Sequence, residues 1–361
     1  MPQSTSTASW AEAQAKRPLA LEAAGAAGFD ALVASTPPTV RWLLAGRGRP
    51  ISAPESPYRV TVTADRAVVL VPDIEEPRVE AEERFEELGY EVETFPWFEG
   101  PDRVVRELVG GLAAATDSDV EEALAPSRRS LCANERERYR DAGAAAAEAM
   151  VACVHALSPE ETELEATARL AYEARTRGFF PPVVLVGGEA RLGVYRHPLP
   201  TEERLGRQAL LAVTAERDGL HVSLTRIVSF GPPPKELERL ARIAAEVDAV
   251  VLAASRPGTR LGEVFAAGAR AYADRGYPEE WRFHHQGGLT GYAGREVFAV
   301  PDEPTPLPAS CAVAWNPSVT GGGKSEDTAL VSADGVEVVS RTPELAESEI
   351  DGLVRPAIAV L

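Results

Sequence analysis

The chain has 361 residues, of which 45% are hydrophobic and 25% are charged, so it is long enough for two domains and has the composition of a globular protein with a sizeable core. Its formal net charge of −18 argues against partners that need a basic surface, namely nucleic acid and anionic membranes. The sequence also lacks a run of ~18 apolar residues, the apolar core of a signal peptide and any CxxC pair among its three cysteines, so we expect a cytoplasmic protein.

Short apolar runs alternate with helical patterns in the first third of the chain. Helices are predicted over residues 11–27, 75–88 and 102–114, the first two closed by Gly28 and Gly89. β-type runs bounded by Pro, Gly, Asp and Ser are predicted at 29–34, 39–45, 59–63, 67–71 and 91–95. This alternation predicts a small α/β domain with a mixed sheet over residues 1–127, with a polar linker over 116–129.

Two helix starts open the second predicted domain, residues 128–361. Asn134 followed by Glu137 has capping-box spacing and starts a helix to about Leu157, and Ser158 with Glu161 starts a second helix that ends at Gly178. A strand at 183–186 follows, and apolar runs on both sides of Asp218-Gly219 predict two antiparallel strands. Helices at 235–254 and about 259–276 come next, so the order helix–helix–strands occurs twice.

The hairpin around Asp218-Gly219 resembles the central hairpin of the pita-bread hydrolases, the family of aminopeptidase P, prolidase, methionine aminopeptidase and creatinase. There it reads roughly vliD.ga.ydGY.sDitRt, and its two Asp hold a dinuclear metal centre. Here Leu224-Thr225-Arg226 also matches, but the two ligand positions hold Ala212 and Ser223. Four further stretches are similar to family motifs in the same order: Arg196-His197-Pro198 to "H..P", His284 to Leu289 to "GHGiGl", Ala314-Trp315-Asn316-Pro317 to "t.EPg", and Lys324 to Thr328 to "riEDt".

The resemblance covers most of the chain and is densest over residues 134–340. It implies an α/β (α+β) protein with a creatinase-like α/β domain followed by a pita-bread domain that contains an internal pseudo-repeat. It also implies a homodimer.

Only two of the five metal-ligand positions implied by the resemblance keep a ligand, namely His285 and Glu326. Ala212 cannot coordinate, and Ser223 and Asn316 are neutral where the family has carboxylates. Dinuclear sites of this kind are assembled mainly from carboxylates, which supply negative charge and bridge two ions. We therefore expect no metal and no other cofactor.

Creatinase has this fold, uses no metal, and hydrolyses a C–N bond with a His as general acid/base. By resemblance, His197 falls on that His, and Glu326 falls on a Glu that binds the substrate guanidinium. With a one-residue shift, the stretch from Tyr292 to Glu296 resembles a creatinase "YGRE" whose Arg, here Arg295, holds the substrate carboxylate. Arg47 resembles an Arg that reaches the site of the partner subunit. Thr225 replaces a second creatinase Glu, which argues against creatine as the substrate.

The predicted catalytic residues are therefore His197 and Glu326. The predicted substrate-binding residues are Arg295, His285, Arg47, Ser223, Thr225, Asn316 and Tyr292. A His whose pKa is near 7 can accept and donate protons at neutral pH, and an Arg binds a carboxylate through two hydrogen bonds. Such a set suits hydrolysis of a small carboxylate-bearing amide, amidine or amino-acid-like substrate, or of a short peptide.

Three alternatives stay open at this point. One is a prolidase-like or Xaa-Pro aminopeptidase-like metallopeptidase with an altered site, rebuilt from His284, His285, Glu326 and an unidentified group. The second is a non-catalytic paralogue that binds a ligand in its cleft, and the third is a biosynthetic enzyme with a non-hydrolytic reaction. His284 is expected to be a supporting or structural residue, and without a metal His285 is expected only to bind substrate.

Overall fold

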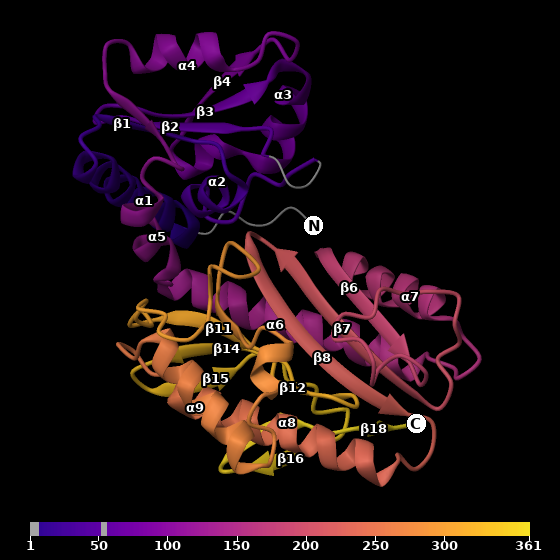
Figure 1. The fold of residues 1–361 in the computed structure, drawn as a ribbon. Coiled ribbons are helices and arrows are strands. Elements are labelled where there is room, and N and C mark those ends of the chain that lie inside the picture. Colours follow the sequence, from indigo (N-terminus) through magenta and orange to yellow (C-terminus); the bar gives the residue numbers. More distant parts are fainter. Residues whose placement is uncertain (1–6, 52–55) are drawn as a thin grey trace. The chain divides into compact units, whose positions relative to one another are not determined.

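A computed structural model describes residues 7–51 and 56–361 of the chain (Figure 1). By its internal contacts the chain divides into two compact units, Met1–Asn134 and Glu135–Leu361. The domain ranges 1–127 and 128–361 stay predictions beside these units. Within the described ranges, no helix combines the length and the apolarity required to cross a membrane.

The N-terminal unit is built on a five-stranded mixed sheet in the order β4-β3-β2-β1-β5. Strands β1 to β3 pair antiparallel, whereas β4 and β5 add in parallel to β3 and β1. Val68 and Leu70 of β3 pack with Phe95 of β4 and Val104 of α4 in a buried cluster. The elements are α1 (Thr7–Ala26), β1 (Ala31–Ala34), α2 (Pro37–Leu43), β2 (Arg59–Val62), β3 (Ala67–Pro72), α3 (Glu76–Arg78), β4 (Glu91–Phe95), α4 (Asp102–Val109), β5 (Ala114–Thr116) and α5 (Glu121–Arg129).

The strand predicted at 39–45 is wrong, because these residues belong to helix α2. The helix begins with Pro37 and Pro38, and proline favours the first turn of a helix because its missing N–H needs no partner there. All residues from Thr39 to Leu43 are buried, so the helical period does not show in the sequence.

Three further boundaries in this unit differ from prediction. The single helix predicted over 75–88 is broken into short turns, and Arg84 between them adopts a left-handed conformation, with φ 46°. The guanidinium of Arg47 donates to the carbonyls of Glu83 and Arg84 at 2.7 and 2.8 Å, so a tertiary contact satisfies groups that a continuous helix would use. The helix predicted over 102–114 ends at Val109, and the linker predicted over 116–129 contains helix α5.

The C-terminal unit repeats one pattern, two helices followed by strands. The first copy is α6 (Ala133–His155), α7 (Glu163–Thr176), β6 (Phe180–Gly188), β7 (Gln208–Arg217) and β8 (Leu220–Ser229). The second copy starts with α8 (Lys235–Ala254), α9 (Leu261–Asp274), β9 (Gly287–Thr290), β10 (Val297–Phe298), β11 (Cys311–Trp315), β12 (Ser318–Val319), β13 (Gly323–Lys324), β14 (Asp327–Ser332) and β15 (Gly335–Val338). The chain closes with β16 (Glu347–Ile350), β17 (Leu353–Pro356) and β18 (Ala359–Val360). The predicted pita-bread domain with its pseudo-repeat is therefore confirmed.

The helix predicted to start at Ser158 begins four residues later. Thr162 is its N-cap, and Thr162 and Glu165 form the reciprocal capping box, with the Thr162 hydroxyl accepting from the Glu165 amide at 3.2 Å. Ser158 and Glu161 have the same spacing, but the Glu161 carboxylate only closes a turn onto the Ser158 amide at 3.0 Å. Helix α6 begins at Ala133, one residue before the predicted cap.

The long hairpin β7–β8 forms the centre of a four-stranded sheet, β18-β8-β7-β6 (Figure 1). Its turn needs positive φ at both central residues, and Asp218 and Gly219 provide it with φ 51° and 83°. The second sheet has the order β10-β9-β11-β14-β15. Helix α8 joins the two cores, because its start packs on β7 and β8 through Leu237 and its end packs on β11 through Val251.

Candidate active site

The two sheets of the C-terminal unit meet where β8 crosses the chain just before β14. The backbone of Thr225 donates to the Glu326 carbonyl at 3.1 Å, and the Thr328 hydroxyl bonds both backbone groups of Ser223 at 2.8 and 3.0 Å. This junction brings Ser223 and Thr225 beside Glu326, although about one hundred residues separate them in sequence.

A cavity of about 190 Å³ lies at this junction. Its polar wall consists of His197, Thr214, His285, Arg295, Asn316, Lys324 and Glu326. Its apolar wall consists of Val183, Leu185, Ala212, Val213 and Phe298, with Gly294 between the two walls. The structure therefore brings together both predicted catalytic residues and three of the predicted substrate-binding residues.

Glycines allow the close approaches that place the histidines. Gly287 and Gly288 follow His285 with φ 99° and 146°, and a side chain on either would collide with the backbone of β11 or of Val297. Gly187 on β6 lies so close to Pro198 that a Cβ there would come within 2.7 Å of the ring. The segment that carries His197 is thereby held on the sheet beside the cavity.

The guanidinium of Arg295 links Ser223 and Glu326, two positions where the sequence resemblance leads us to expect metal ligands. Its Nη1 donates to the Ser223 hydroxyl at 3.2 Å, and its Nη2 donates to Glu326 Oε1 at 3.2 Å. The other carboxylate oxygen of Glu326 accepts from the Thr225 hydroxyl at 2.6 Å. Burial lowers the pKa of Arg295, and the attraction of Glu326 opposes that shift. Arg295 therefore lies as a buried cation between Ser223 and Glu326.

Lys324 is a cavity residue that the sequence analysis did not single out. It lies two residues before Glu326, and because side chains of an extended chain alternate, both reach the same side. Its side chain is 5% exposed, and its Nζ lies 4.0 Å from Glu326 Oε2. Burial lowers the pKa of Lys324, and Glu326 raises it. The alternation of residues 324–327 was the signal that could have identified Lys324.

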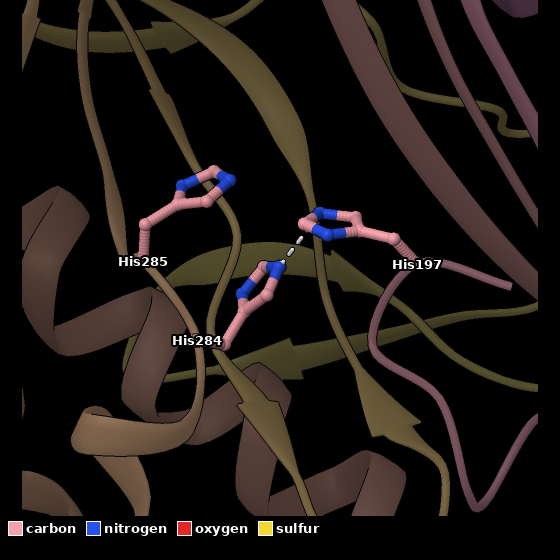
Figure 2. A group of neighbouring side chains, drawn as sticks. All are labelled: His197, His284 and His285. Carbon is pink, nitrogen blue, oxygen red and sulfur yellow. Dashed lines mark hydrogen bonds between the residues drawn. The ribbon is translucent and has the colours of Figure 1, made fainter.

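Three histidines lie close together, as Figure 2 shows, and two of them, His197 and His285, line the cavity. His284 Nε2 lies 3.1 Å from His197 Nε2, and the ring of His285 stacks on that of His284 with centroids 4.5 Å apart. His197 and His285 are exposed, whereas His284 is buried. Desolvation and the charge of Lys324 lower the pKa values of His197 and His284. Desolvation and Arg295 lower the pKa of His285 to about 4, so all three imidazoles are neutral near pH 7.

Two of the predicted site residues lie away from this cavity. The Tyr292 hydroxyl donates to Glu135 on α6 at 2.7 Å and accepts from Arg138 at 2.8 Å, so it fastens a loop to a helix. Arg47 belongs to the other unit, where it holds the carbonyls of Glu83 and Arg84. Its role in a partner subunit stays a prediction. Ser223 does not line the cavity but contacts it through Arg295.

The doubled helix–helix–strand pattern, with a polar cavity at the junction of its two sheets, defines a hydrolase of the pita-bread fold. The profile of metallopeptidase family M24 matches residues 137–333, more than half of the chain, and the chain belongs to this family. The recognised resemblance is thereby confirmed.

Relatives and solved structures agree with this placement. An uncharacterised peptidase of Staphylococcus aureus (strain USA300) is 23% identical over 247 residues, which cover 65% of this chain and 69% of that protein. The structure is similar to a dipeptidase PepE from Mycobacterium ulcerans, with a TM-score of 0.72, 20% identity and coverage of 92% of this chain and 97% of that one. It is also similar to a prolidase from Pyrococcus horikoshii OT3, with a TM-score of 0.75, 17% identity and coverage of 94% and 100%.

Proposed function

We propose that the chain is a metal-independent hydrolase that cleaves a C–N bond in a small carboxylate-bearing substrate, in the manner of creatinase. One observation carries the proposal: the guanidinium of Arg295 bonds to Ser223 and Glu326, two of the positions that hold metal ions in the family. A fixed cation there takes over the charge that a metal would supply.

The residues present do not fit the dinuclear centre that the family name implies. Ala212 offers no donor, and Ser223 and Asn316 offer neutral oxygens where the centre needs carboxylates. Glu326 is the carboxylate that the cavity wall contains, and its two oxygens are already bonded to Arg295 and Thr225. Two metal ions would have to compete with Arg295 and Lys324 for one carboxylate. No step of the proposed reaction therefore runs through a metal.

The charges of the cavity favour an anionic substrate. Arg295 and Lys324 are two cations, and Glu326 balances one of them. The nearest acidic atom to Lys324 Nζ is 4.0 Å away, too far for a hydrogen bond, so its ammonium is available to a substrate carboxylate. Such a contact is charge-assisted and lies in a buried site, where it is stronger than in water. Lys324 thus takes the carboxylate-binding role that the sequence resemblance gave to Arg295.

His197 is placed to move protons. As a neutral imidazole exposed to the cavity, it accepts a proton from water while the water oxygen attacks the substrate carbon. It then donates that proton to the leaving nitrogen. His284 lies 3.1 Å away, and the hydrogen bond between the two Nε2 atoms holds the His197 ring in place. Glu326 orients the substrate or the water beside Lys324.

The test uses protein stripped with EDTA and a substrate panel of Xaa-Pro dipeptides, N-acyl amino acids and N-amidino amino acids, with products identified by mass. We expect the stripped protein to hydrolyse a member of the panel without added metal, and His197→Ala to lower kcat by about 10²–10⁴, the usual contribution of a general acid/base. His155→Ala, at the end of α6, is the matched control.

Three results would overturn the proposal. Activity lost with EDTA and restored by Mn²⁺ would identify a prolidase-like metallopeptidase. Tight binding of a panel member without product would identify a non-catalytic ligand-binding paralogue, and a product of unchanged mass would identify a non-hydrolytic enzyme.

A cytoplasmic homodimer is part of this proposal. The resemblance supports it, and the three cysteines are free, as a reducing compartment would have them. Light scattering after gel filtration measures the mass, and a monomer would remove the proposed reach of Arg47 into a partner site.

A further inference from the structure

The histidine cluster has the composition and spacing of metal ligands. Three of the five histidines of the chain, His197, His284 and His285, offer ring nitrogens that all lie within 4.8 Å of one another (Figure 2). They come from two segments about ninety residues apart, so their meeting is a product of the fold and not of local sequence.

The geometry of the first pair is close to that of bound ligands. Nitrogens that share a tetrahedral Zn²⁺ at about 2.0–2.1 Å are roughly 3.3 Å apart. His197 Nε2 and His284 Nε2 are 3.1 Å apart, close to that separation. The Nδ1 of His284 is buried and has no hydrogen-bond partner among the described residues, so neither ring nitrogen of His284 bonds to a protein group other than an imidazole. We propose that His197, His284 and His285 bind one divalent ion of the imidazole-preferring kind, Zn²⁺ or Cu²⁺.

This site differs in ligands from the dinuclear centre of the family and shares only His285 with it. Its donors are imidazoles, which suit Zn²⁺ and Cu²⁺, whereas Mn²⁺ prefers carboxylates and water. The charges nearby sharpen the choice. Lys324 and Arg295 repel a cation, and Glu326 offsets only one of these two charges. An ion with weak affinity for imidazole would therefore not bind tightly enough to overcome the repulsion.

An ion can reach the cluster and keep an open position. His197 and His285 are exposed and line the cavity, while His284 is buried beside them. Three protein ligands leave the fourth position of a tetrahedral ion to water or a ligand. Coordination uses the lone pair with which His197 would accept a proton, so the bound ion would inhibit the proposed hydrolysis. The titration measures binding without turnover, so the site can be tested even if the proposed hydrolysis fails.

The experiment titrates untagged, EDTA-stripped full-length protein with Zn²⁺ by calorimetry, followed by elemental analysis after gel filtration. We expect one equivalent of Zn²⁺ with a micromolar or lower Kd, and a higher Tm with the ion. Co²⁺ in its place should give the visible absorption of a tetrahedral nitrogen site. His284→Ala and His285→Ala should each weaken Zn²⁺ binding at least tenfold, and His155→Ala should leave it unchanged.

Three outcomes would overturn the site. The first is Zn²⁺ binding that His284→Ala and His285→Ala leave unchanged, and the second is a protein that retains no Zn²⁺ at micromolar concentration. The third is retention of two equivalents of Mn²⁺, which would mean a family-type centre. His285 is exposed, so His285→Ala keeps the test decisive if the buried His284 variant unfolds.

Discussion

Two regions of buried charge lie on opposite sides of one short segment, residues 324–327. Lys324 and Glu326 reach the cavity, whereas Ser325 and Asp327 reach a polar network on the other side. In that network Asp327 pairs with Arg226 at 2.9 Å and with Arg355 at 2.7 Å. Arg355 also pairs with Asp248 at 2.6 Å. Two arginines and two aspartates leave no net charge.

The cavity side has a different balance. Arg295 and Lys324 face one carboxylate, and Lys324 Nζ stays 4.0 Å from it. Asn316 Oδ1 on the cavity side and Asp248 Oδ1 in the network are both buried without a partner among the described residues, so the two sides differ in charge balance and not in satisfied hydrogen bonds. The network therefore stabilises the junction of the sheets, and the cavity keeps unbalanced charge for a ligand.

The largest loss of stability should come from a substitution that breaks the buried charge network. Asp327→Asn removes the charge that both Arg226 and Arg355 bond, and leaves two buried cations facing Asp248 alone. We expect a loss of about 3–5 kcal/mol in the free energy of unfolding, the usual cost of removing one partner of a buried ion pair. Urea unfolding followed by circular dichroism measures it. Glu236→Gln, in an exposed pair on α8, is the control and should change little.

Smaller losses of stability should distinguish the two sides of the segment 324–327. The Ser325 hydroxyl donates to Asp248 Oδ2 at 2.5 Å, so Ser325→Ala should cost about 1.5–3 kcal/mol, the range for hydrogen bonds to charged groups. Asn316→Ala on the cavity side should cost less, because the side-chain oxygen that it removes has no partner to lose. The same urea titration compares them, and equal losses would contradict the distinction between the two regions.

The sequence predicted the cavity better than the network. Motif order and spacing located His197, His285, Asn316 and Glu326, which line one cavity. These residues lie in stretches with recognisable neighbours. The network also has two members in matched stretches, Arg226 and Asp327, but their pairing with Asp248 and Arg355 follows no motif or spacing, so only the folded chain shows it.

The errors in the N-terminal unit have a related cause. Residues 39–43 are buried throughout in helix α2, which removes the periodicity that separates helix from strand. The turns around Arg84 are set by the distant Arg47, so the local pattern from 75 to 88, typical of a charged helix, did not decide the structure. Long amphipathic elements gave no such difficulty, and α8 spans the predicted 235–254.

The smallest change in stability should be a gain, and it should come from Lys324. Lys324 is a buried cation without a hydrogen-bonded carboxylate, so its charge costs desolvation energy that the 4.0 Å approach to Glu326 only partly offsets. Lys324→Met keeps the length of the side chain and removes the charge, and Arg295 still bonds to Glu326. We expect a gain of about 1–2 kcal/mol in the free energy of unfolding, since removing strained functional groups commonly stabilises a protein. The same variant should bind carboxylate-bearing ligands with lower affinity, as measured by calorimetry.

Lys235→Met, at the exposed start of α8, controls for the general effect of losing a lysine. If Lys324→Met destabilised the protein as Asp327→Asn should, Lys324 would be a structural partner of Glu326, and its ammonium would not be available to a substrate carboxylate.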